Sequence, residues 1–219
     1  MQRHAPAHPL GGVSGASETT MGKRLFDILV STLGLLVMAP ALAVLAVLVT
    51  ALNGRPVLFR QRRVGRGGRE FALYKFRTMT VAPGAEAGSF DAGSVARVTP
   101  LGRFLRKTKL DELPQLWSVL RGDMSLVGPR PEVRKWVDVY PERWRYVHMV
   151  RPGITDPASI AYRNEEAILA NAANPEEAYR HEILPRKLSL YEEYVRSHTL
   201  LGDVRILART AGALLRGRG

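Results

Sequence analysis

The segment ILVSTLGLLVMAPALAVLAVLVTAL, residues 28–52, decides how the rest of the chain is organised. It contains no charged residue, and its only polar side chains are those of Ser31, Thr32 and Thr50. A straight helix of this length would measure roughly 37 Å, which exceeds the hydrocarbon core of a bilayer, about 30 Å. The segment therefore predicts a membrane-associated helix, although the mean hydropathy of the whole chain is only −0.09.

Three arrangements of this segment compete: a spanning helix, a secretory signal and a re-entrant helix that enters and leaves by the same face. A signal is disfavoured because the run exceeds the usual apolar core of about 7–15 residues and follows a polar stretch.

Lys23 and Arg24 precede the run and six arginines follow it between residues 55 and 69. Because short basic flanks stay on the cytoplasmic side, both ends are expected there. Pro40 removes a helical hydrogen bond at the middle of the run, which favours a re-entrant helix–break–helix over residues 21–54. The alternative is a spanning helix with a tolerated kink.

The regions around this segment differ in composition. Residues 1–20 lack hydrophobic periodicity and predict a disordered tail. Residues 55–219 predict one cytoplasmic domain of the α+β class, mostly helical, with membrane-surface amphipathic helices. Two β-prone runs, 57–59 and 71–74, are separated by glycines and predict a small hairpin. Residues 81–96 are small, polar and glycine-rich, which indicates a mobile loop.

Helices are predicted in the second half of the chain. Thr99 and Pro100 are typical of an N-cap and a first helical position, and a second helix is expected to begin near Asp111. Two apolar stripes follow near the C-terminus: Leu184, Leu188, Tyr191 and Val195, and then Leu200, Val204, Leu207, Ala211 and Leu214. The second stripe has arginines on its other faces, so it fits a helix at a membrane surface and a solvated core helix equally well.

Composition limits the chemistry. Lys and Arg outnumber Asp and Glu by 32 to 20, a formal net charge of +12. Such an excess favours an anionic partner: nucleic acid, an anionic membrane surface or a phosphorylated substrate. The chain has no cysteine, which excludes disulfides, zinc–thiolate sites and thiol nucleophiles.

The candidate chemistry lies in LRKTKLDELPQLWSVLRGDMSLVGPRPE, residues 105–132. If Asp111 capped the second helix, both carboxylates would sit at its positive end, and adjacent residues on a helix do not share a face. We therefore expect Asp111 and Glu112 to have different roles, one attacking an electrophile and the other holding a divalent cation such as Mg²⁺. Arg130 lies between two prolines, which preorganise its guanidinium for phosphate binding. The alternative is that the acid pair is only a helix cap beside a solvated basic face.

Several sequence blocks occur together: KRLFD (23–27), YKFRTM (74–79), LDELPQL (110–116), GDMSLVGPRPE (122–132) and RPGIT (151–155). With these blocks the chain resembles, from about residue 23 to residue 210, the bacterial sugar transferase family of monotopic phosphoglycosyl transferases.

The resemblance implies an activity and a location. Asp111 would attack the β-phosphate of a UDP-sugar, releasing UMP, and the resulting phosphosugar would pass to polyprenyl phosphate, the first step of a cell-surface glycan. Glu112 would bind Mg²⁺, and Pro40 would break the membrane helix. The enzyme would lie on the cytoplasmic face of the bacterial inner membrane, in contact with one leaflet. The resemblance and the sequence blocks suggest these phosphate-binding residues: Arg106 and Arg130, with Lys75, Arg77 and Arg151 as further candidates.

The sequence departs from the family pattern at three points. Ala39 stands where a serine often precedes the proline, Asp156-Pro157 stands where many members have Gly-Trp, and the four-helix membrane domain of larger members is missing, so we expect a minimal form. Two alternatives remain: a membrane-tethered basic module without enzymatic activity, and an inactive homologue. We expect no nucleic-acid partner, and the sequence neither requires nor excludes a homodimer.

Overall fold

The computed structural model describes residues 16–80 and 97–216 of the chain. The disordered tail was predicted over residues 1–20; residues 1–15 of it lie outside the described residues, as does the loop predicted over 81–96, whereas residues 16–20 are helical. The helices are α1 (Ala16–Asn53), α2 (Pro100–Thr108), α3 (Gln115–Arg121), α4 (Arg134–Val137), α5 (Pro141–Val147), α6 (Pro157–Ala161), α7 (Glu165–Ala170), α8 (Pro175–Ala178), α9 (Leu184–Ser197) and α10 (Leu200–Leu215). The strands are β1 (Leu58–Val64), β2 (Glu70–Phe76), β3 (Ser125–Val127) and β4 (Gly153–Thr155). The predicted class, mostly helical α+β with a long apolar helix near the N-terminus, is confirmed.

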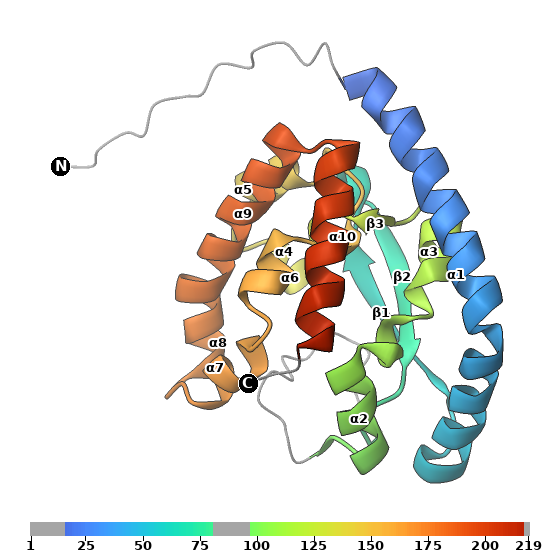
Figure 1. Ribbon diagram of the computed structural model, residues 1–219. Coiled ribbons are helices and arrows are strands. Elements are labelled where there is room, and N and C mark those ends of the chain that lie inside the picture. Colours follow the sequence, from blue (N-terminus) through green and yellow to red (C-terminus); the bar gives the residue numbers. More distant parts are fainter. Residues whose placement is uncertain (1–15, 81–96, 217–219) are drawn as a thin grey trace.

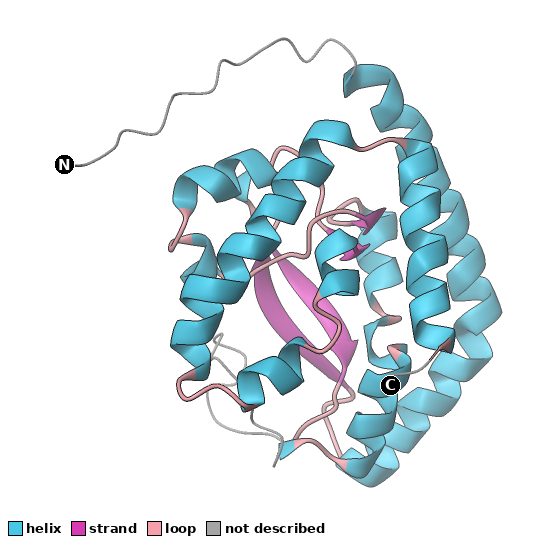
Figure 2. Cartoon of the chain, turned by 60° about the vertical axis from the view of Figure 1, so that its left-hand side comes forward, coloured by secondary structure: helices cyan, strands magenta, loops and turns pink. Residues whose placement is uncertain are grey.

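The strands form two small sheets. β1 and β2 pair antiparallel, from Leu58 opposite Phe76 to Val64 opposite Glu70, which confirms the predicted hairpin. Its turn includes Gly67 and Gly68 at φ of 67° and 74°, a conformation that favours glycine. β3 and β4 pair parallel. In Figure 1, α1 runs along one side of the molecule and α9 along the other, with the hairpin between them; α10 contacts α1 and lies beside it in Figure 2.

Helix α1 differs from the prediction at Pro40. The predicted interruption is absent: α1 is one helix from Ala16 to Asn53 with Pro40 inside it, and it begins before the predicted boundary at residue 21. Pro40 itself is exposed, while the buried positions on either side of it, Asp27 and Ser31 before and Leu45 and Val49 after, share one face. Because this face packs against the domain along most of the helix, both halves are held in place and the lost hydrogen bond causes no break.

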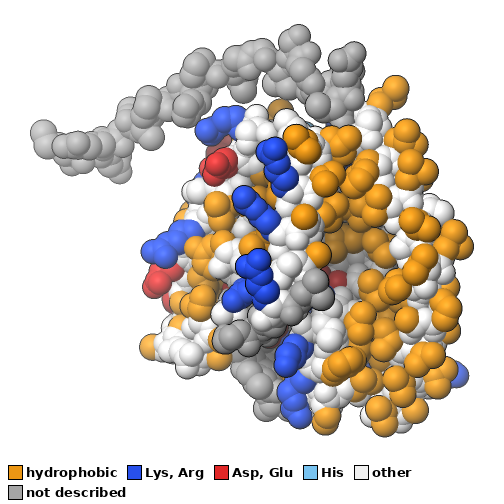
Figure 3. Space-filling model, in the orientation of Figure 1, with side chains coloured by type: hydrophobic (Ala, Val, Ile, Leu, Met, Phe, Trp, Pro, Cys, Tyr) orange, Lys and Arg blue, Asp and Glu red, His pale blue; other side chains and the backbone are white. Residues whose placement is uncertain are grey.

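The rest of α1 is apolar and exposed. Its residues from Met21 to Asn53 are long and apolar enough to cross a membrane by length and composition, and among the described residues only this helix is. The exposed large side chains of α1 are Met21, Leu25, Ile28, Leu29, Val30, Leu33, Leu36, Val37, Val44, Val47, Leu48 and Leu52. Figure 3 shows the resulting hydrophobic surface over α1. A soluble protein seldom exposes a continuous apolar surface of this kind, so α1 needs an apolar environment or partner.

The charged residues at the start of α1 attach it to the domain. Lys23 forms an ion pair with Asp203 and donates to the carbonyl of Val127 at 2.9 Å. Arg24 donates to the carbonyls of Val119 and Leu120, which end α3. Asp27 is buried and accepts a hydrogen bond from the amide of Leu126 at 3.1 Å. The KRLFD block is therefore an anchor that joins α1 to α3, β3 and α10.

The two predicted C-terminal stripes have different surroundings. Leu184, Leu188 and Tyr191 of α9 are buried in the main core, as predicted, whereas Val195 is half-buried. On α10, Leu200, Val204, Ala211 and Leu214 are exposed and Leu207 is half-buried. Most of the α10 stripe is therefore exposed among the described residues, although Leu207 packs against the core, and this favours the membrane-surface alternative.

Candidate active site

The acid pair lies in a turn between α2 and α3. Thr99 caps α2 as predicted, accepting from the amide of Gly102 at 2.9 Å. Helix α2 ends at Lys109, which has a left-handed conformation at φ 60°, and a single 3₁₀ turn, Leu110–Glu112, follows. α3 begins only at Gln115, after Pro114, so Asp111 does not cap it and that prediction is wrong. The local reason is that the left-handed Lys109 ends α2 before the acid pair and Pro114 occupies the position before α3.

Close packing of α2 against β2 positions this turn. A Cβ atom at Gly102 would lie 2.0 Å from the carbonyl oxygen of Thr78, so only glycine allows the helix to approach the end of the strand. The approach lets Arg106 donate from Nε to the hydroxyl of Thr78 at 2.9 Å. Lys75 near the end of β2, and Thr78 two residues after the strand, thereby lie on the segment against which α2 packs.

Asp111 is buried without a full set of partners. The residue is only 5% exposed, and its Oδ1 atom has no hydrogen-bond partner within the described part of the chain. Burial, and next the charge of Glu112, raise the pKa of Asp111 to about 6, against the opposing effects of Lys75, Lys109 and Arg106. Near neutral pH the group is mostly a carboxylate with one bare oxygen, the form that a nucleophile requires.

Glu112 has the opposite electrostatic character. Arg130 donates to it from Nη2 to Oε1 at 2.7 Å and from Nη1 to Oε2 at 3.4 Å, and Lys109 lies 3.7 Å from Oε1. Burial acts to raise the pKa of Glu112, but the charges of Arg130 and Lys109 outweigh it and lower the pKa to about 2. The two neighbouring carboxylates thus have separate environments, as their expected division of roles requires.

Two further cations lie near Asp111. Lys75, half-buried on β2, has its pKa lowered to about 8 by burial and by the charge of Arg63, so it remains mostly protonated at neutral pH. Arg106 donates from Nη1 to Oε1 of Glu166 at 3.1 Å, and the Glu166 side chain is 59% exposed. Arg106 is therefore held by a neutral hydroxyl on one side and by a displaceable surface carboxylate on the other.

The segment that carries Arg130 is braced from behind. Arg63 donates from Nη1 to the carbonyl of Pro131 at 3.1 Å and to Glu132 at 2.8 Å. Tyr179 donates to the other oxygen of Glu132 at 2.7 Å. These contacts fix the backbone on the C-terminal side of Arg130.

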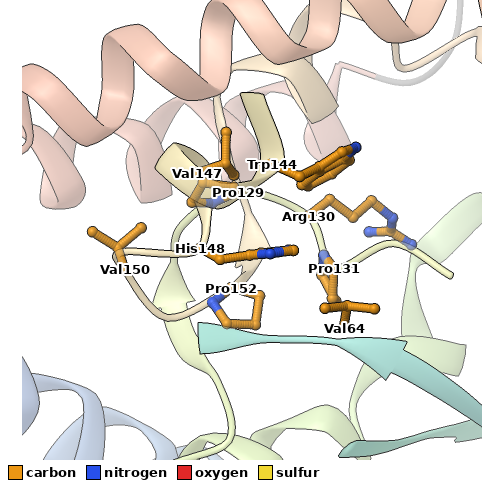
Figure 4. Close-up of a pocket in the computed structure, with 9 residues that line it drawn as sticks. All are labelled: Val64, Pro129, Arg130, Pro131, Trp144, Val147, His148, Val150 and Pro152. Atoms are coloured by element: carbon orange, nitrogen blue, oxygen red, sulfur yellow. The ribbon is translucent and has the colours of Figure 1, made fainter. Parts of the chain in front are cut away.

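A small cavity lies on the inner side of the same segment. Figure 4 shows Pro129, Pro131 and the rings of Trp144 and His148 lining it, while the guanidinium of Arg130 points away from the two rings. Burial lowers the pKa of His148 to about 4, so its ring is neutral at neutral pH. The prolines therefore contact uncharged surfaces, and Arg130 is directed towards Glu112.

Two predicted phosphate ligands have other contacts. Arg77 donates to the carbonyls of Asn53 and Arg55 at the end of α1, so its guanidinium ties the helix to β2. Arg151 donates to the carbonyl of Gly122, which caps the C-terminal end of α3, whereas the acid pair precedes the other end. Their contacts give no support to the predicted phosphate-binding roles.

The unusual Asp156 has a structural explanation. It is fully buried and caps α6, accepting from the amide of Ser159 at 2.9 Å, and Pro157 occupies the first helical position. An aspartate followed by proline is a strong helix-start signal. The Asp156-Pro157 departure therefore forms a helix N-terminus.

The residues present fit a magnesium ion only in part. Mg²⁺ is usually held by one or two carboxylates together with substrate phosphates. The bare Oδ1 of Asp111 is a suitable oxygen, and Oε2 of Glu112 is held only at 3.4 Å by Arg130. Residues 16–80 and 97–216 contain no group of three or more His, Asp or Glu side chains with metal-binding geometry, so substrate oxygens would have to complete the coordination.

Sequence reasoning did not identify several residues of this site. Thr78 was part of the YKFRTM block, but nothing in the pattern gave it a partner. The braces Arg63 and Tyr179, and the competing Glu166, come from segments distant in sequence, and only the folded chain brings them to the site.

Comparisons with known proteins identify the family of this chain. Residues 18–217 match the model of a family described as "Bacterial sugar transferase". The chain is 34% identical to the UDP-N-acetylgalactosamine-undecaprenyl-phosphate N-acetylgalactosaminephosphotransferase of Aeromonas hydrophila, with 99% of this chain and 49% of the relative covered. It is 36% identical to the UDP-glucose:undecaprenyl-phosphate glucose-1-phosphate transferase of Klebsiella pneumoniae, covering 92% of this chain and 41% of the relative. It is also 43% identical to the uncharacterized sugar transferase EpsL of Bacillus subtilis, over 65% of this chain and 69% of the relative. The chain spans half or less of the length of the first two relatives, and it belongs to the bacterial sugar transferase family.

Proposed function

We propose that this protein transfers a sugar 1-phosphate from a UDP-sugar to undecaprenyl phosphate or a similar polyprenyl phosphate, the first step in building a polysaccharide. The observation that carries the proposal is the buried carboxylate of Asp111, which has one unpartnered oxygen and is surrounded by Lys75, Lys109 and Arg106. Phosphoryl transfer consists largely of positioning and charge stabilisation, and this cluster supplies both. The printed names of two relatives describe the same reaction class.

The reaction proceeds in two displacements at one phosphorus. An oxygen of Asp111 bonds to the β-phosphorus of the UDP-sugar, and the bond from that phosphorus to the bridging oxygen breaks, which releases UMP. A phosphate oxygen of the polyprenyl phosphate then bonds to the same phosphorus, and the bond to Asp111 breaks. The products are a polyprenyl diphosphosugar, UMP and the regenerated carboxylate.

The neighbouring residues divide the remaining work. Lys75 and Arg106 bind the diphosphate oxygens and stabilise the charge that the leaving UMP gains. Glu112 and Arg130 hold each other in place, and Arg130 would also bind the phosphate of the acceptor. A bound Mg²⁺, held by the acid pair and substrate oxygens, would supply additional charge neutralisation of the diphosphate.

The membrane arrangement is part of the proposal. We infer that α1 lies in one leaflet as a continuous helix with both of its ends at the same membrane face, because both of its flanks are basic and its exposed surface is apolar. The exposed apolar stripe of α10, with Arg205 and Arg209 beside it, would rest on the same surface. The catalytic domain would then lie at the cytoplasmic face of the inner membrane, within reach of a lipid acceptor.

The decisive experiment uses the full chain in lipid nanodiscs with a UDP-sugar and no lipid acceptor. We expect stoichiometric release of UMP and a phosphosugar adduct on Asp111 by intact-mass and peptide mass spectrometry. Asp111→Asn should release UMP at least about 10⁴-fold more slowly, since removing a nucleophile removes the covalent route. Absence of the adduct from the unsubstituted protein, across a panel of UDP-sugars, would refute the proposal and favour an inactive homologue or a binding module.

A further inference from the structure

Two large aromatic residues near the acid pair are exposed. Phe104 on α2 is 53% exposed and Trp117 on α3 is 55% exposed, although both helices pack other apolar residues into the core. Helical spacing places each beside leucines: Phe104 is three residues from Leu101, and Trp117 is three residues from Leu120. Both leucines are half-buried, and Leu101 packs in the cluster that contains Leu45 and Val49 of α1. The two aromatics therefore lie on the exposed surfaces of α2 and α3, next to residues that pack inwards.

The aromatics stand on either side of the acid pair. Leu116, next to Trp117, lies against Gly34 of α1, whereas Leu105, next to Phe104, clusters with Leu45. Eleven positions separate Gly34 from Leu45, a distance of roughly 16 Å along a helix. The turn with Asp111 and Glu112 connects α2 to α3, so it lies between the two aromatics in the chain and along α1.

We propose that Phe104 and Trp117 bind the isoprenoid chain of the lipid acceptor and lead its phosphate to Asp111. This inference rests on the proposed function, because it assigns a contact surface to the second substrate of that reaction. An isoprenoid phosphate is a long apolar chain with an anionic head. The exposed apolar face of α1 continues the aromatic surface on one side, and the exposed Arg103 and Lys107 flank Phe104 on α2 and can attract the head group.

The shape of the surface agrees with this assignment. Figure 3 shows a hollow between the basic side chains of α10 and the hydrophobic surface of α1, with an acidic side chain visible inside it. Aromatic side chains bury a large apolar area at low conformational cost, which suits a surface that must hold a flexible chain. Because the acid pair lies between α2 and α3 in the chain, an isoprenoid chain held by the two aromatics would bring its head group towards Asp111.

The test separates the two half-reactions. We prepare the double variant Phe104→Ala/Trp117→Ala, the conservative variant Phe104→Leu/Trp117→Phe, and Met149→Ala as a matched control, since Met149 is an apolar residue of similar exposure, 51%, after α5. Because both aromatics are more than half exposed, their truncation leaves no core cavity. Each variant is assayed in nanodiscs for UMP release without acceptor, and then for the KM of long-chain undecaprenyl phosphate and of a two-isoprene phosphate.

We expect the double alanine variant to raise the KM for the long-chain acceptor about tenfold. The KM for the short acceptor and the rate of UMP release without acceptor should change less than twofold. The conservative variant should recover most of the long-chain KM, and Met149→Ala should match the unsubstituted protein.

Two results would overturn the inference. One is an unchanged long-chain KM in the double alanine variant. The other is an equal loss with both acceptors together with release of the variant from vesicles, which would make the aromatics membrane anchors only. Failure of the unsubstituted protein to form the adduct would instead overturn the proposed function, so the two failures are distinguishable.

Discussion

The turn at Asp111 and the anchor at the start of α1 are both rich in charged residues, but the two regions differ in how fully those charges are paired. In the anchor, Lys23, Arg24 and Asp27 each have close partners on α3, β3 or α10. In the turn, Asp111 is buried with a bare oxygen and a raised pKa. The charges of the anchor all have partners, and they hold a helix in place. The carboxylate in the turn lacks a full set of partners and is therefore available for chemistry.

This difference implies that the same substitution should act in opposite directions in the two regions. A buried aspartate whose oxygens all have partners contributes to stability. A buried carboxylate that lacks partners reduces stability, because it has lost its hydration without compensation. Stability measurements therefore distinguish the two roles without an assay for activity.

The largest stability effect is expected at Asp203, the partner of Lys23. Its carboxylate also accepts from the hydroxyl of Tyr194 at 2.8 Å, and the residue is 1% exposed. Asp203→Asn leaves Lys23 without its counter-charge and should lower the free energy of unfolding by about 3 kcal/mol. Denaturant unfolding in detergent micelles measures this. The control Glu142→Gln removes an exposed ion pair with Arg145 and should change stability by less than about 0.5 kcal/mol. An equally small change for Asp203→Asn would contradict the anchor role.

A smaller effect of opposite sign is expected at Asp111. Because burial raises its pKa from 3.8 to about 6, the folded state binds a proton more tightly than the unfolded state does. Ionisation therefore costs stability progressively between pH 4 and pH 6, and the full cost remains above pH 6. Asp111→Asn should thus have little effect at pH 4 and should raise the free energy of unfolding by about 2 kcal/mol at pH 7.5. The same denaturation series at both pH values measures this, with Asp123→Asn, a partly exposed acid paired with Arg121, as the control. A stability loss at pH 7.5 would show that Asp111 is a structural carboxylate like Asp203.

The smallest effect concerns the competing carboxylate Glu166. Its ion pair with Arg106 occupies a guanidinium that the donor diphosphate requires under the proposed function. Glu166→Gln should lower the KM for the UDP-sugar by up to about fivefold, because an exposed ion pair is worth less than about 1 kcal/mol, and should leave kcat unchanged. Initial-rate kinetics of UMP release measures both constants. Glu142→Gln again serves as the control, and an increase of KM in Glu166→Gln would indicate that Glu166 binds the donor instead.

Local patterns predicted much of this molecule. The hairpin, the cap at Thr99, the buried stripe of α9 and the unusual apolar segment depend on propensities and periodicities within a few turns of chain. The acid pair and the constrained Arg130 were recognisable because their residue types and spacing have chemical meaning. The pairing of Arg130 with Glu112, across 18 positions, was not recognisable from the sequence, because a conformationally restricted arginine is equally suited to a carboxylate and to a phosphate.

Pattern reasoning failed where long-range packing dominates. Pro40 predicts a break when α1 is considered alone, but contacts on both sides of it keep the helix continuous. Pattern alone also did not show that Arg77 and Arg151 donate to backbone carbonyls near the ends of α1 and α3, and their phosphate-binding roles stay predictions. A positive charge in a sequence does not indicate whether its partner will be a substrate or the protein itself.

The sequence alone determined that this chain has a long apolar helix, an excess of basic residues and an adjacent pair of acids with basic neighbours. Only the tertiary structure decided that Asp111 is the bare carboxylate and Glu112 the paired one. The reason is physical: burial and the positions of Lys75, Arg106 and Arg130 set the two pKa values, and those positions depend on how α2, β2 and the proline-flanked segment pack together.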